Sequence, residues 1–450
     1  MSKNLIQPRT LKGFRDFLPA DMIPREKMME TAREVYRSYG FVPIETPALE
    51  YAEILCGKGS EETDRQMFRF IDHGKRDVGM RFDLTVPLAR FVAKNSNELG
   101  LPFKRYQLGM VWRGEKPQVG RYREFAQCDF DTIGTTSINS DVETALVIFD
   151  LMRAIGFEKF KIRINNRKVL NGLLQKFDLG QFSTEVLRAI DKLPKIGREK
   201  VRDEIMSATA AGESQVEQIL ELSDITGANA DVLNKLDKVC LGNELAEQGT
   251  AELRTLISAT EAVGVTDNNL NIDVSIARGL DYYTGTIFET FLDDLPSIGS
   301  VCSGGRYDNL AQLFTKQQLP GVGASLGLDR LLAAMQKLEM IPAVKTTADV
   351  LIVQFDADNF NDYLKIAAAL RTGGIRTEVF PEQKKMDKQF KYADRRGIQF
   401  VVIAGADELQ ADKVKVKCLA DGSQTEIPYS VDSAAELVGA LQKLIANPPR

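Results

Sequence analysis

Residues 103–133, FKRYQLGMVWRGEKPQVGRYREFAQCDFDTI, decide the fold. Both ends of this stretch have the aromatic and β-branched content of strands, at Phe103–Arg113 and Arg123–Ile133. Residues 114–122 join them without room for a helix, so the two strands are expected to pair antiparallel. Long loops of this kind often carry function. The sequence therefore predicts an antiparallel hairpin with a functional loop.

A row of polar side chains follows the second strand of this hairpin. Side chains alternate between the two faces of a strand, so Gln127, Asp129 and Asp131 share one face. If Arg81–Thr85 is also extended, Arg81, Asp83 and Thr85 form a second polar row. We predict that these rows form the floor of a ligand site. A solvated sheet face is the alternative that the pattern leaves open.

The length and composition around this stretch indicate a globular protein. The chain has 450 residues, enough for two or three domains, with 44% apolar and 27% charged residues. No run of apolar residues is long enough to cross a membrane, and the first residues lack the apolar core of a signal peptide. We therefore expect a cytoplasmic protein that does not bind membranes.

Cysteine and histidine usage excludes several kinds of chemistry. The five cysteines are scattered, which argues against a disulfide framework or a zinc site. His73 is the only histidine, so neither a two-histidine metal site nor a further histidine-dependent step is available if His73 acts as a base. No metal-ligating residue is predicted. The net charge of −5 means that a polyanionic partner would need local basic patches.

Changes in composition along the chain predict its domains. A helix is expected from Pro24 to the stop at Gly40, followed by an edge strand at Phe41–Ile44. Residues from about 172 to 262 are rich in leucine, lysine, glutamate and alanine, which predicts a helical insertion. Residues 341–347 have the composition of a linker. Beyond them, strands and helices alternate, so we predict one domain at 1–340 and an α/β domain at 348–450.

Four clusters combine arginines with glycines or polar residues. They are residues 113–123, 277–286, 303–308 and 321–330. Arginine offers a planar fork that matches phosphate oxygens. The G-x-G-x-x-x-G spacing of the fourth cluster is not that of a dinucleotide-binding site. Taken together, Arg113, Arg278 and Arg330 favour phosphoryl or nucleotidyl chemistry on ATP, although each cluster alone is also compatible with a turn or a solvated hairpin.

Two of these clusters resemble signatures of the histidyl-tRNA synthetase family, a class II aminoacyl-tRNA synthetase family. They are Arg278-Gly-Leu-Asp-Tyr-Tyr-Thr-Gly-Thr-Ile-Phe-Glu289 and Ser303-Gly-Gly-Arg-Tyr-Asp308. Residues 40–50, 112–131 and 321–331 resemble class II motifs 1, 2 and 3. The resemblance implies an α/β multidomain protein: an α+β catalytic domain at 1–340, built on an antiparallel sheet with a helical insertion, and an α/β anticodon-binding domain at 348–450.

The resemblance also implies roles for individual residues. Arg113 and Arg278 would be the catalytic residues that hold the ATP α-phosphate, and Arg330 would bind the ATP tail. The histidine substrate would be bound by Asp83, Thr85, Gln127, Asp131, Arg278, Tyr282, Tyr283 and Tyr307. Gln118 would approach the tRNA acceptor end, and Mg²⁺ would bridge the ATP phosphates.

The implied reaction joins L-histidine to tRNA(His) through histidyl-adenylate, in a homodimer. Asp83 and Asp131 depart from the glutamates of many bacterial members. A basic patch in the C-terminal domain would hold RNA phosphates; its residues are Lys384, Lys385, Lys388, Lys391, Arg395 and Arg396. The alternative is a non-catalytic relative that binds histidine, the regulatory subunit of ATP phosphoribosyltransferase.

Overall fold

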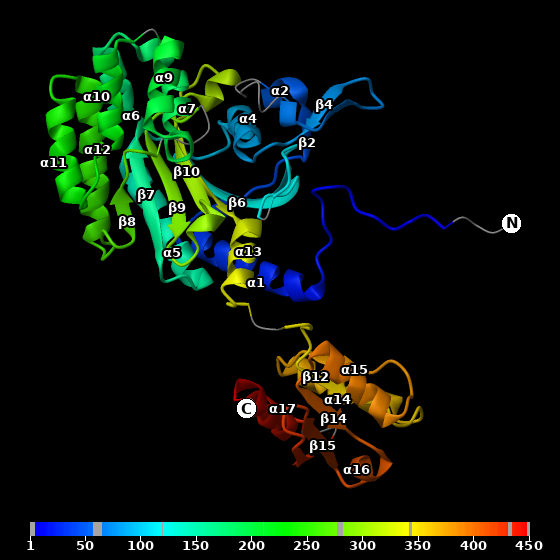
Figure 1. The fold of residues 1–450 in the computed structure, drawn as a ribbon. Helices are drawn as coiled ribbons and strands as arrows, with labels where there is room; N and C mark the ends of the chain where they lie inside the picture. Colours follow the sequence, from blue (N-terminus) through cyan, green and yellow to red (C-terminus); the bar gives the residue numbers. More distant parts are fainter. Residues whose placement is uncertain are drawn as a thin grey trace. The chain divides into compact units, whose positions relative to one another are not determined.

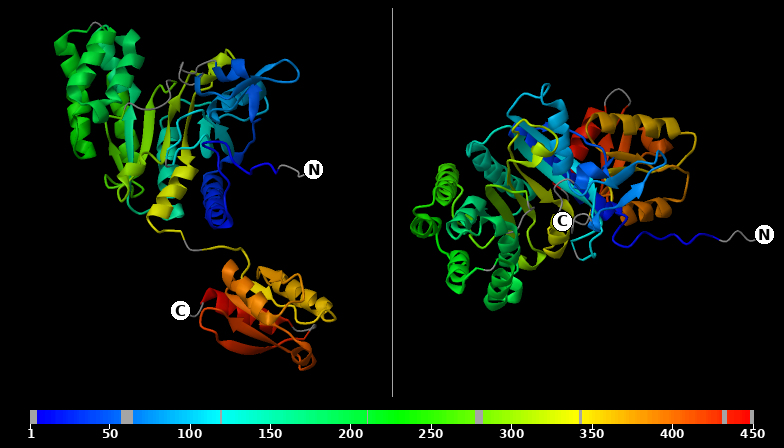
Figure 2. Two further views of the ribbon diagram at one scale, coloured as in Figure 1. Left: turned by 45° about the vertical axis from the view of Figure 1, so that its right-hand side comes forward. Right: turned by 90° about the horizontal axis from the view of Figure 1, so that it is seen from above.

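The computed structural model describes residues 5–56, 65–118, 120–209, 211–276, 282–341, 344–430 and 434–447. The chain divides into two compact units, one that contains Arg25–Met340 and one that contains Ile341–Arg450. Figure 1 and Figure 2 show a large sheet with helices in the first unit and a smaller sheet with helices in the second. The structure therefore has the mixed α/β catalytic fold, the helical segment and the C-terminal α/β domain that the sequence predicts.

An eight-stranded sheet forms the centre of the larger unit. Its order is β1-β5-β6-β11-β10-β9-β7-β8, and its neighbours pair antiparallel except at β1–β5 and β7–β8. The strands are β1 (Val42–Pro43), β5 (Phe103–Trp112), β6 (Glu124–Ile133), β7 (Phe160–Asn166), β8 (Leu270–Ile272), β9 (Thr286–Leu292), β10 (Cys302–Tyr307) and β11 (Gly321–Gly327). The predicted hairpin is confirmed as the antiparallel pair β5–β6. The proline-containing strand β1 lies at the edge of the sheet, as expected.

Helices bury their apolar faces against this sheet. They are α1 (Pro19–Ser38), α4 (Thr85–Asn95), α5 (Asn139–Ile155) and α13 (Leu328–Lys337). Tyr36 of α1 is fully buried, and its hydroxyl donates a hydrogen bond to the carbonyl of Cys128 at 2.9 Å. The predicted start of the first helix at Pro24 is wrong. The helix begins at Pro19, which supplies the preset backbone angle of a first helical residue, and Pro24 lies inside it.

A second, three-stranded sheet lies beside α4 and α2 (Ala52–Cys56). Its order is β2-β4-β3, with β2 (Leu49–Tyr51), β3 (Arg69–Ile71) and β4 (Asp77–Met80). The prediction that Arg81–Thr85 is a strand is wrong. The Asp83 carboxylate accepts hydrogen bonds from the amides of Thr85 at 3.0 Å and Val86 at 2.9 Å. Asp83 therefore satisfies the free amides of the first turn of α4, and the chain becomes helical instead of extended.

Residues 167–261 are helical apart from short connections. The helices are α6 (Arg167–Lys176), α7 (Ser183–Ile190), α8 (Leu193–Ile196), α9 (Arg198–Thr209), α10 (Glu213–Ser223), α11 (Asn229–Cys240) and α12 (Glu244–Glu261), with a 3₁₀ turn at Gly180–Phe182. Helices α6 and α12 cross closely because Gly172 has no side chain. A Cβ at that position would lie 2.4 Å from Asn243 Oδ1. In Figure 1 these helices stand together at the β7–β8 end of the sheet.

The C-terminal unit contains a mixed five-stranded sheet. Its order is β13-β12-β14-β15-β16, with β12 (Val350–Ile352), β13 (Thr377–Val379), β14 (Phe400–Ile403), β15 (Lys413–Cys418) and β16 (Gln424–Pro428). The helices are α14 (Phe360–Thr372), α15 (Met386–Arg396), α16 (Ala406–Gln410) and α17 (Ala435–Ala446). Strands β12–β14 are parallel, as their alternation with helices predicts, and β15–β16 add an antiparallel pair. Among the described residues no helix is long and apolar enough to span a bilayer.

Candidate active site

A cavity of about 250 Å³ opens on the polar face of the large sheet. Strand β6 supplies its floor, β9, β10 and β11 supply one side, and the segment that precedes α4 supplies another. Nine of the predicted site residues line it: Asp83, Thr85, Arg113, Gln127, Asp131, Tyr282, Tyr283, Tyr307 and Arg330. The sheet thus brings together residues from distant parts of the sequence.

Strand register explains why the floor is open. In the pairing of β6 with β11, Asp131 lies opposite Gly323 and Gln127 lies opposite Gly327. A Cβ at Gly323 would lie 2.3 Å from Asp131 Oδ1 and 2.3 Å from the carbonyl oxygen of Phe130. Between the two glycines, Ser325 faces Asp129, and its hydroxyl accepts a hydrogen bond from the Gln127 amide at 2.9 Å. Small side chains on β11 therefore leave room above the polar side chains of β6.

Buried carboxylates make this floor acidic. Asp83, Asp129 and Asp131 are each less than 10% exposed. Burial raises the pKa of all three, and it raises that of Asp129 to about 7. Oδ1 of Asp129 makes no hydrogen bond within the described residues. The floor is therefore ready to bind a cation or a hydrogen-bond donor.

Arg105 of β5 lies directly opposite Asp131, on the same face of the sheet, and compensates part of the charge of the floor. The side chain is completely buried, and its Nη2 lies 2.6 Å from Asp131 Oδ2. Its positive charge lowers the pKa of Asp129 and Asp131, although burial dominates in both. One guanidinium beside three carboxylates leaves the floor with excess negative charge when all are ionised.

Three tyrosines form the aromatic wall of the cavity. The Tyr307 hydroxyl donates to Asp131 Oδ1, which fixes the ring over the floor. Tyr282 meets Tyr283 edge to face with ring centroids 5.2 Å apart, and it meets Tyr307 in the same way at 5.8 Å. Burial raises the pKa of all three hydroxyls, so they stay neutral near pH 7. Neutral phenol rings next to an acidic floor provide a suitable surface for a flat polar ring.

A second cavity of about 210 Å³ shares six residues with the first and is lined by arginines. Arg113, Arg121 and Arg330 all face it, and Phe125 provides an aromatic surface. The pKa of Arg330 is lowered, first by burial and then by the charge of Arg121. Arg113 is held against the Phe82 ring at 4.5 Å, and its Nε donates to the Phe82 carbonyl at 3.0 Å. Clustered, partly desolvated arginines favour a ligand with several negative charges.

Comparison with known proteins identifies this arrangement. The family model for histidyl-tRNA synthetase matches residues 13–331, and the anticodon-binding domain model matches residues 347–443. The chain belongs to the histidyl-tRNA synthetase family. It is 56% identical to the histidine–tRNA ligase of Rhodopirellula baltica over 97% of this chain and 99% of the other. It is 45% identical to the enzyme of Wolinella succinogenes over 96% and 98% of the two chains.

Solved structures agree with this family assignment. The histidyl-tRNA synthetase of Nostoc sp. PCC 7120 superposes with a TM-score of 0.87 at 37% identity, over 98% of this chain and 100% of the other. A Bacillus halodurans protein, described as an ATP phosphoribosyltransferase regulatory subunit/histidyl-tRNA synthetase, superposes with a TM-score of 0.75 at 22% identity, over 89% and 99% of the two chains. The second comparison shows a shared fold only.

The structure does not place two of the predicted residues in these cavities, for different reasons. Arg278 lies outside the described residues. Gln118 lies in a tight turn of the motif 2 loop, where its amide and that of Arg121 exchange hydrogen bonds with the two carbonyls at 3.0 and 2.9 Å. The loop faces the second cavity through Glu115, Gly120 and Arg121 instead.

Among the described residues, sequence reasoning assigned no role to five polar residues that line the first cavity: Asp129, Glu289, Ser300, Ser303 and Ser325. Asp129 is predicted on the correct face of its strand but without a role, although the period-two pattern marks it equally with Gln127 and Asp131. Glu289 ends a family signature, and its direction depends on the pairing of β9 with β10. No local signal marks Ser325, because its position follows from the register of β11 on β6.

The predicted basic patch lies at and before α15 of the C-terminal unit. All six of its side chains are exposed, and Lys384 and Lys385 precede the helix. The buried face of α15 is formed by Gln389 and Ala393, so the basic residues occupy the opposite, solvated side. Among the described residues no group of three or more acidic, histidine or cysteine side chains is arranged to hold a metal ion.

Proposed function

We propose that this synthetase joins L-histidine to tRNA(His) in two steps, through histidyl-adenylate. The observation that carries the proposal is the junction of two cavities, one acidic and lined by tyrosines and the other lined by arginines. An amino acid in the first and a triphosphate in the second would meet at Arg113, which lines both. Holding two reactants in contact removes much of the entropic barrier of a reaction between them.

Histidine is proposed to bind with its ammonium group on the carboxylates of Asp83 and Asp131 and on Gln127. Thr85 lies beside Asp83 at the start of α4 and completes this polar end of the cavity. The imidazole would lie against Tyr282, Tyr283 and Tyr307, whose neutral hydroxyls can donate to or accept from a ring nitrogen. The free oxygen of Asp129 is a further acceptor for an imidazole N–H.

ATP is proposed to bind with its phosphates among Arg113, Arg121 and Arg330 and its base near Phe125. In the first step a carboxylate oxygen of histidine attacks the α-phosphorus, and the bond to the β-phosphate oxygen breaks to release pyrophosphate. Arg113 and Arg278 would stabilise the charge that develops on the α-phosphate. In the second step a ribose hydroxyl of tRNA attacks the histidyl carbonyl, AMP leaves, and the hydroxyl proton is released.

Magnesium is proposed to enter with ATP rather than to occupy a site built by the protein alone. Mg²⁺ commonly uses one or two carboxylates together with substrate phosphates and water. Glu289 lines the first cavity and Glu115 lines the second. The described residues therefore offer two carboxylates near the arginines. The ion would neutralise phosphate charge, while the protein residues orient the nucleotide.

The tRNA is proposed to contact both units of the protein. Gln118 in the motif 2 loop would approach the acceptor end, and residues 348–450 would act as the anticodon-binding domain, with the basic patch on phosphates. We further propose that residues 1–340 are the catalytic domain and that about 172–262 are its helical insertion. These substrates belong to protein synthesis, so the cytoplasm is the expected location.

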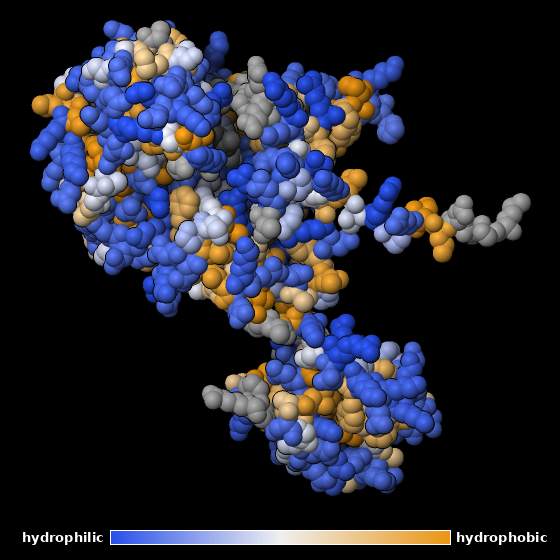
Figure 3. All heavy atoms as spheres, viewed as in Figure 1, coloured by the Kyte–Doolittle hydropathy of each residue, from blue (hydrophilic) through white to orange (hydrophobic). Residues whose placement is uncertain are grey.

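A homodimer is proposed from an exposed apolar surface on the three-stranded sheet and its neighbours. Leu49, Tyr51, Phe70 and Ile71 are 46%, 48%, 46% and 64% exposed. Figure 3 shows hydrophobic side chains on the surface where Figure 1 places β2 and β4. Large apolar side chains gathered on a surface commonly mark an interface, and this surface adjoins the segment that resembles motif 1.

The test is amino-acid-dependent exchange of labelled pyrophosphate into ATP, run separately with each of the twenty amino acids. Exchange with histidine alone is expected. Exchange with another amino acid would overturn the pocket assignment. Histidine binding without any exchange would favour the non-catalytic regulatory relative, which the three arginines of the second cavity oppose.

A further inference from the structure

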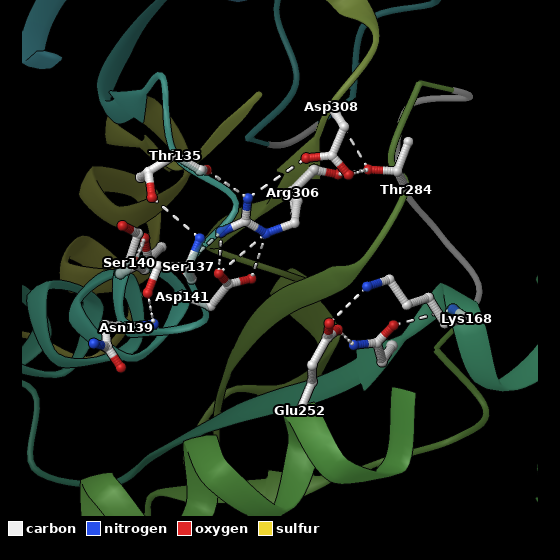
Figure 4. A network of polar contacts seen from close by, with 12 residues as sticks. Thr135, Ser137, Asn139, Ser140, Asp141, Lys168, Glu252, Thr284, Arg306 and Asp308 are labelled. Atoms are coloured by element: carbon white, nitrogen blue, oxygen red, sulfur yellow. Dashed lines mark hydrogen bonds and ion pairs between the residues drawn. The ribbon is translucent and has the colours of Figure 1, made fainter. Parts of the chain in front are cut away.

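A hydrogen-bonded network is centred on Arg306, the residue that precedes Tyr307 on β10 (Figure 4). Arg306 is 4% exposed, and its guanidinium pairs with the completely buried Asp141 at the start of α5. The same group donates to the carbonyls of Thr135 at 3.0 Å and Ser137 at 3.1 Å. Arg306 therefore joins the end of β10 to the connection between β6 and α5.

The network extends from Arg306 to the segment that carries two of the cavity tyrosines. Asp308 Oδ1 lies 3.5 Å from Arg306 Nη1, and Asp308 Oδ2 accepts a hydrogen bond from the Thr284 hydroxyl at 2.5 Å. The Thr284 amide donates to the Arg306 carbonyl at 2.8 Å. Thr284 directly follows Tyr282 and Tyr283, so these bonds fix the backbone from which both rings project.

The third tyrosine is fixed from the same place. Tyr307 follows Arg306 on β10, and successive side chains point to opposite faces of a strand. Arg306 therefore extends toward α5 while Tyr307 lines the cavity. Space for the aliphatic part of the Arg306 side chain depends on Gly285, where an added Cβ would lie 3.0 Å from Arg306 Cδ. The positions of three tyrosines on two segments thus depend on one buried ion pair, Arg306–Asp141.

A nearby ion pair shows what a purely architectural contact looks like here. Lys168 and Glu252 pair at 2.6 Å between α6 and α12, and they appear below the Arg306 network in Figure 4. Their side chains are 17% and 20% exposed. Neither residue lines the cavity or adjoins a residue that does. Loss of that pair is expected to affect stability alone.

We propose that the network of Arg306, Asp141, Asp308 and Thr284 is a positioning device that sets the geometry of the three tyrosines and thereby the affinity for histidine. The proposal rests on the proposed function, because it takes the tyrosine-lined cavity as the histidine site. These four residues do not touch the substrate. They act through Tyr282, Tyr283 and Tyr307, which line the cavity that the imidazole is proposed to occupy.

The test uses Thr284→Val, which keeps the shape of the side chain and removes only the hydroxyl. Dissociation constants for labelled histidine and for ATP are measured on the full-length protein, together with the melting temperature. Histidine binding is expected to weaken about tenfold, since both hydrogen bonds between the Thr284 hydroxyl and Asp308, and with them the placement of two rings, are lost. ATP binding should change by less than about twofold because the arginine cavity is untouched. Glu252→Gln is the matched control, with histidine affinity unchanged.

A second variant, Asp308→Asn, separates the network from a local effect of residue 284. If Asp308 and Thr284 act as one unit, the double variant should bind histidine no more weakly than the weaker single variant. Unchanged histidine affinity in both single variants would overturn the proposal, as would equal weakening of histidine and ATP binding with a lowered melting temperature. If the wild-type protein itself bound no histidine, the proposed function would fail instead.

Discussion

The pKa of the Asp129 carboxyl group differs between the folded protein and the unfolded chain. Its side chain is 2% exposed, and burial raises its pKa to about 7. An aspartate in the unfolded chain has a pKa of about 4. Between this pH and about pH 7 the folded protein therefore binds more protons than the unfolded chain. Asp129 therefore contributes most to stability below about pH 4, and this contribution is lost as the pH rises through about 7.

Asp129→Asn removes this titration and leaves a neutral side chain of the same size. We expect the variant to gain stability relative to the wild type as the pH rises, so that the difference in melting temperature is larger at about pH 8 than at about pH 5. Thermal unfolding at the two pH values measures it. Asp394→Asn, at an exposed position of α15, is the control. An identical difference at both pH values would contradict a raised pKa.

Arg113 lies where the two cavities meet, and its replacement tests charge stabilisation. Removing one donor that stabilises transition-state charge typically costs about 10²–10³ in rate. We expect Arg113→Ala and Arg278→Ala each to slow histidine-dependent pyrophosphate exchange by this factor. Arg33→Ala, a partly exposed arginine of α1 paired with Glu30, is the control. If the exchange rate of one of these variants fell by less than about tenfold, the arginine replaced in it would not have the proposed catalytic role.

At the scale of elements, the site depends on how closely β11 approaches β6. Gly321, Gly323 and Gly327 leave the face of β11 that lies over the carboxylates almost without side chains. Helix α13 follows β11 directly and carries Arg330. An antiparallel pair holds opposite residues about 5 Å apart, so a larger side chain on β11 would fill the cavity. The small residues of the fourth cluster are therefore required by the floor of the site.

Gly323→Ala tests this close approach. The new methyl group would lie 2.3 Å from both Asp131 Oδ1 and the Phe130 carbonyl, so the strands must separate. We expect a stability loss of about 1–3 kcal/mol and a rise of at least about tenfold in KM for histidine. Gly439→Ala in α17, where no atom lies within 4 Å of the new methyl group, should be neutral or stabilising. Unchanged KM and stability in Gly323→Ala would contradict the steric argument.

At the scale of the whole molecule, affinity for RNA must come from local patches because the net charge is −5. Phosphate contacts release counterions, so the affinity that they supply falls with salt. The six exposed basic residues at α15 form such a patch, whereas the floor of the large sheet is acidic. The patch proposed for tRNA and the floor proposed for histidine thus carry opposite charge.

Lys388→Glu combined with Lys391→Glu tests the patch on the full chain. We expect KM for tRNA to rise. The slope of log KM against log salt concentration should fall by roughly one for each phosphate that the patch no longer neutralises. Pyrophosphate exchange should stay at the wild-type rate. Lys365→Glu, at an exposed residue of α14 outside the patch, is the control for a single charge reversal. Aminoacylation with unaltered KM and salt dependence would show that this face does not hold tRNA.

Ile71→Asp tests the proposed dimer surface. A charge placed in a desolvated apolar interface is costly, so the variant should sediment at the monomer mass of 50.1 kDa at concentrations where the wild type sediments at twice that mass. Leu241→Asp, at a residue 73% exposed in the helical segment, should leave the assembly intact. A wild-type protein that sediments as a monomer would refute the dimer.

The sequence by itself determined the features that depend on local pattern. Alternation along residues 124–133 indicated the polar face of β6, and the alternation of strands and helices after residue 348 indicated the parallel part of the C-terminal sheet. Composition also marked the helical segment. These features follow from side-chain period and propensity, which act between near neighbours. The short motifs of two clusters carried the family resemblance.

The tertiary structure alone decided which polar residues form one site. Asp83 became a helix cap because its carboxylate meets two free amides, which no alternation pattern reveals. Ser325 faces Asp129 because β11 pairs with β6 in a register set across about two hundred residues of chain. Arg105 is completely buried beside Asp131, and this burial depends on the elements that pack around the β5–β6 hairpin. Long-range register and burial depend on the whole core, so a linear pattern cannot specify them.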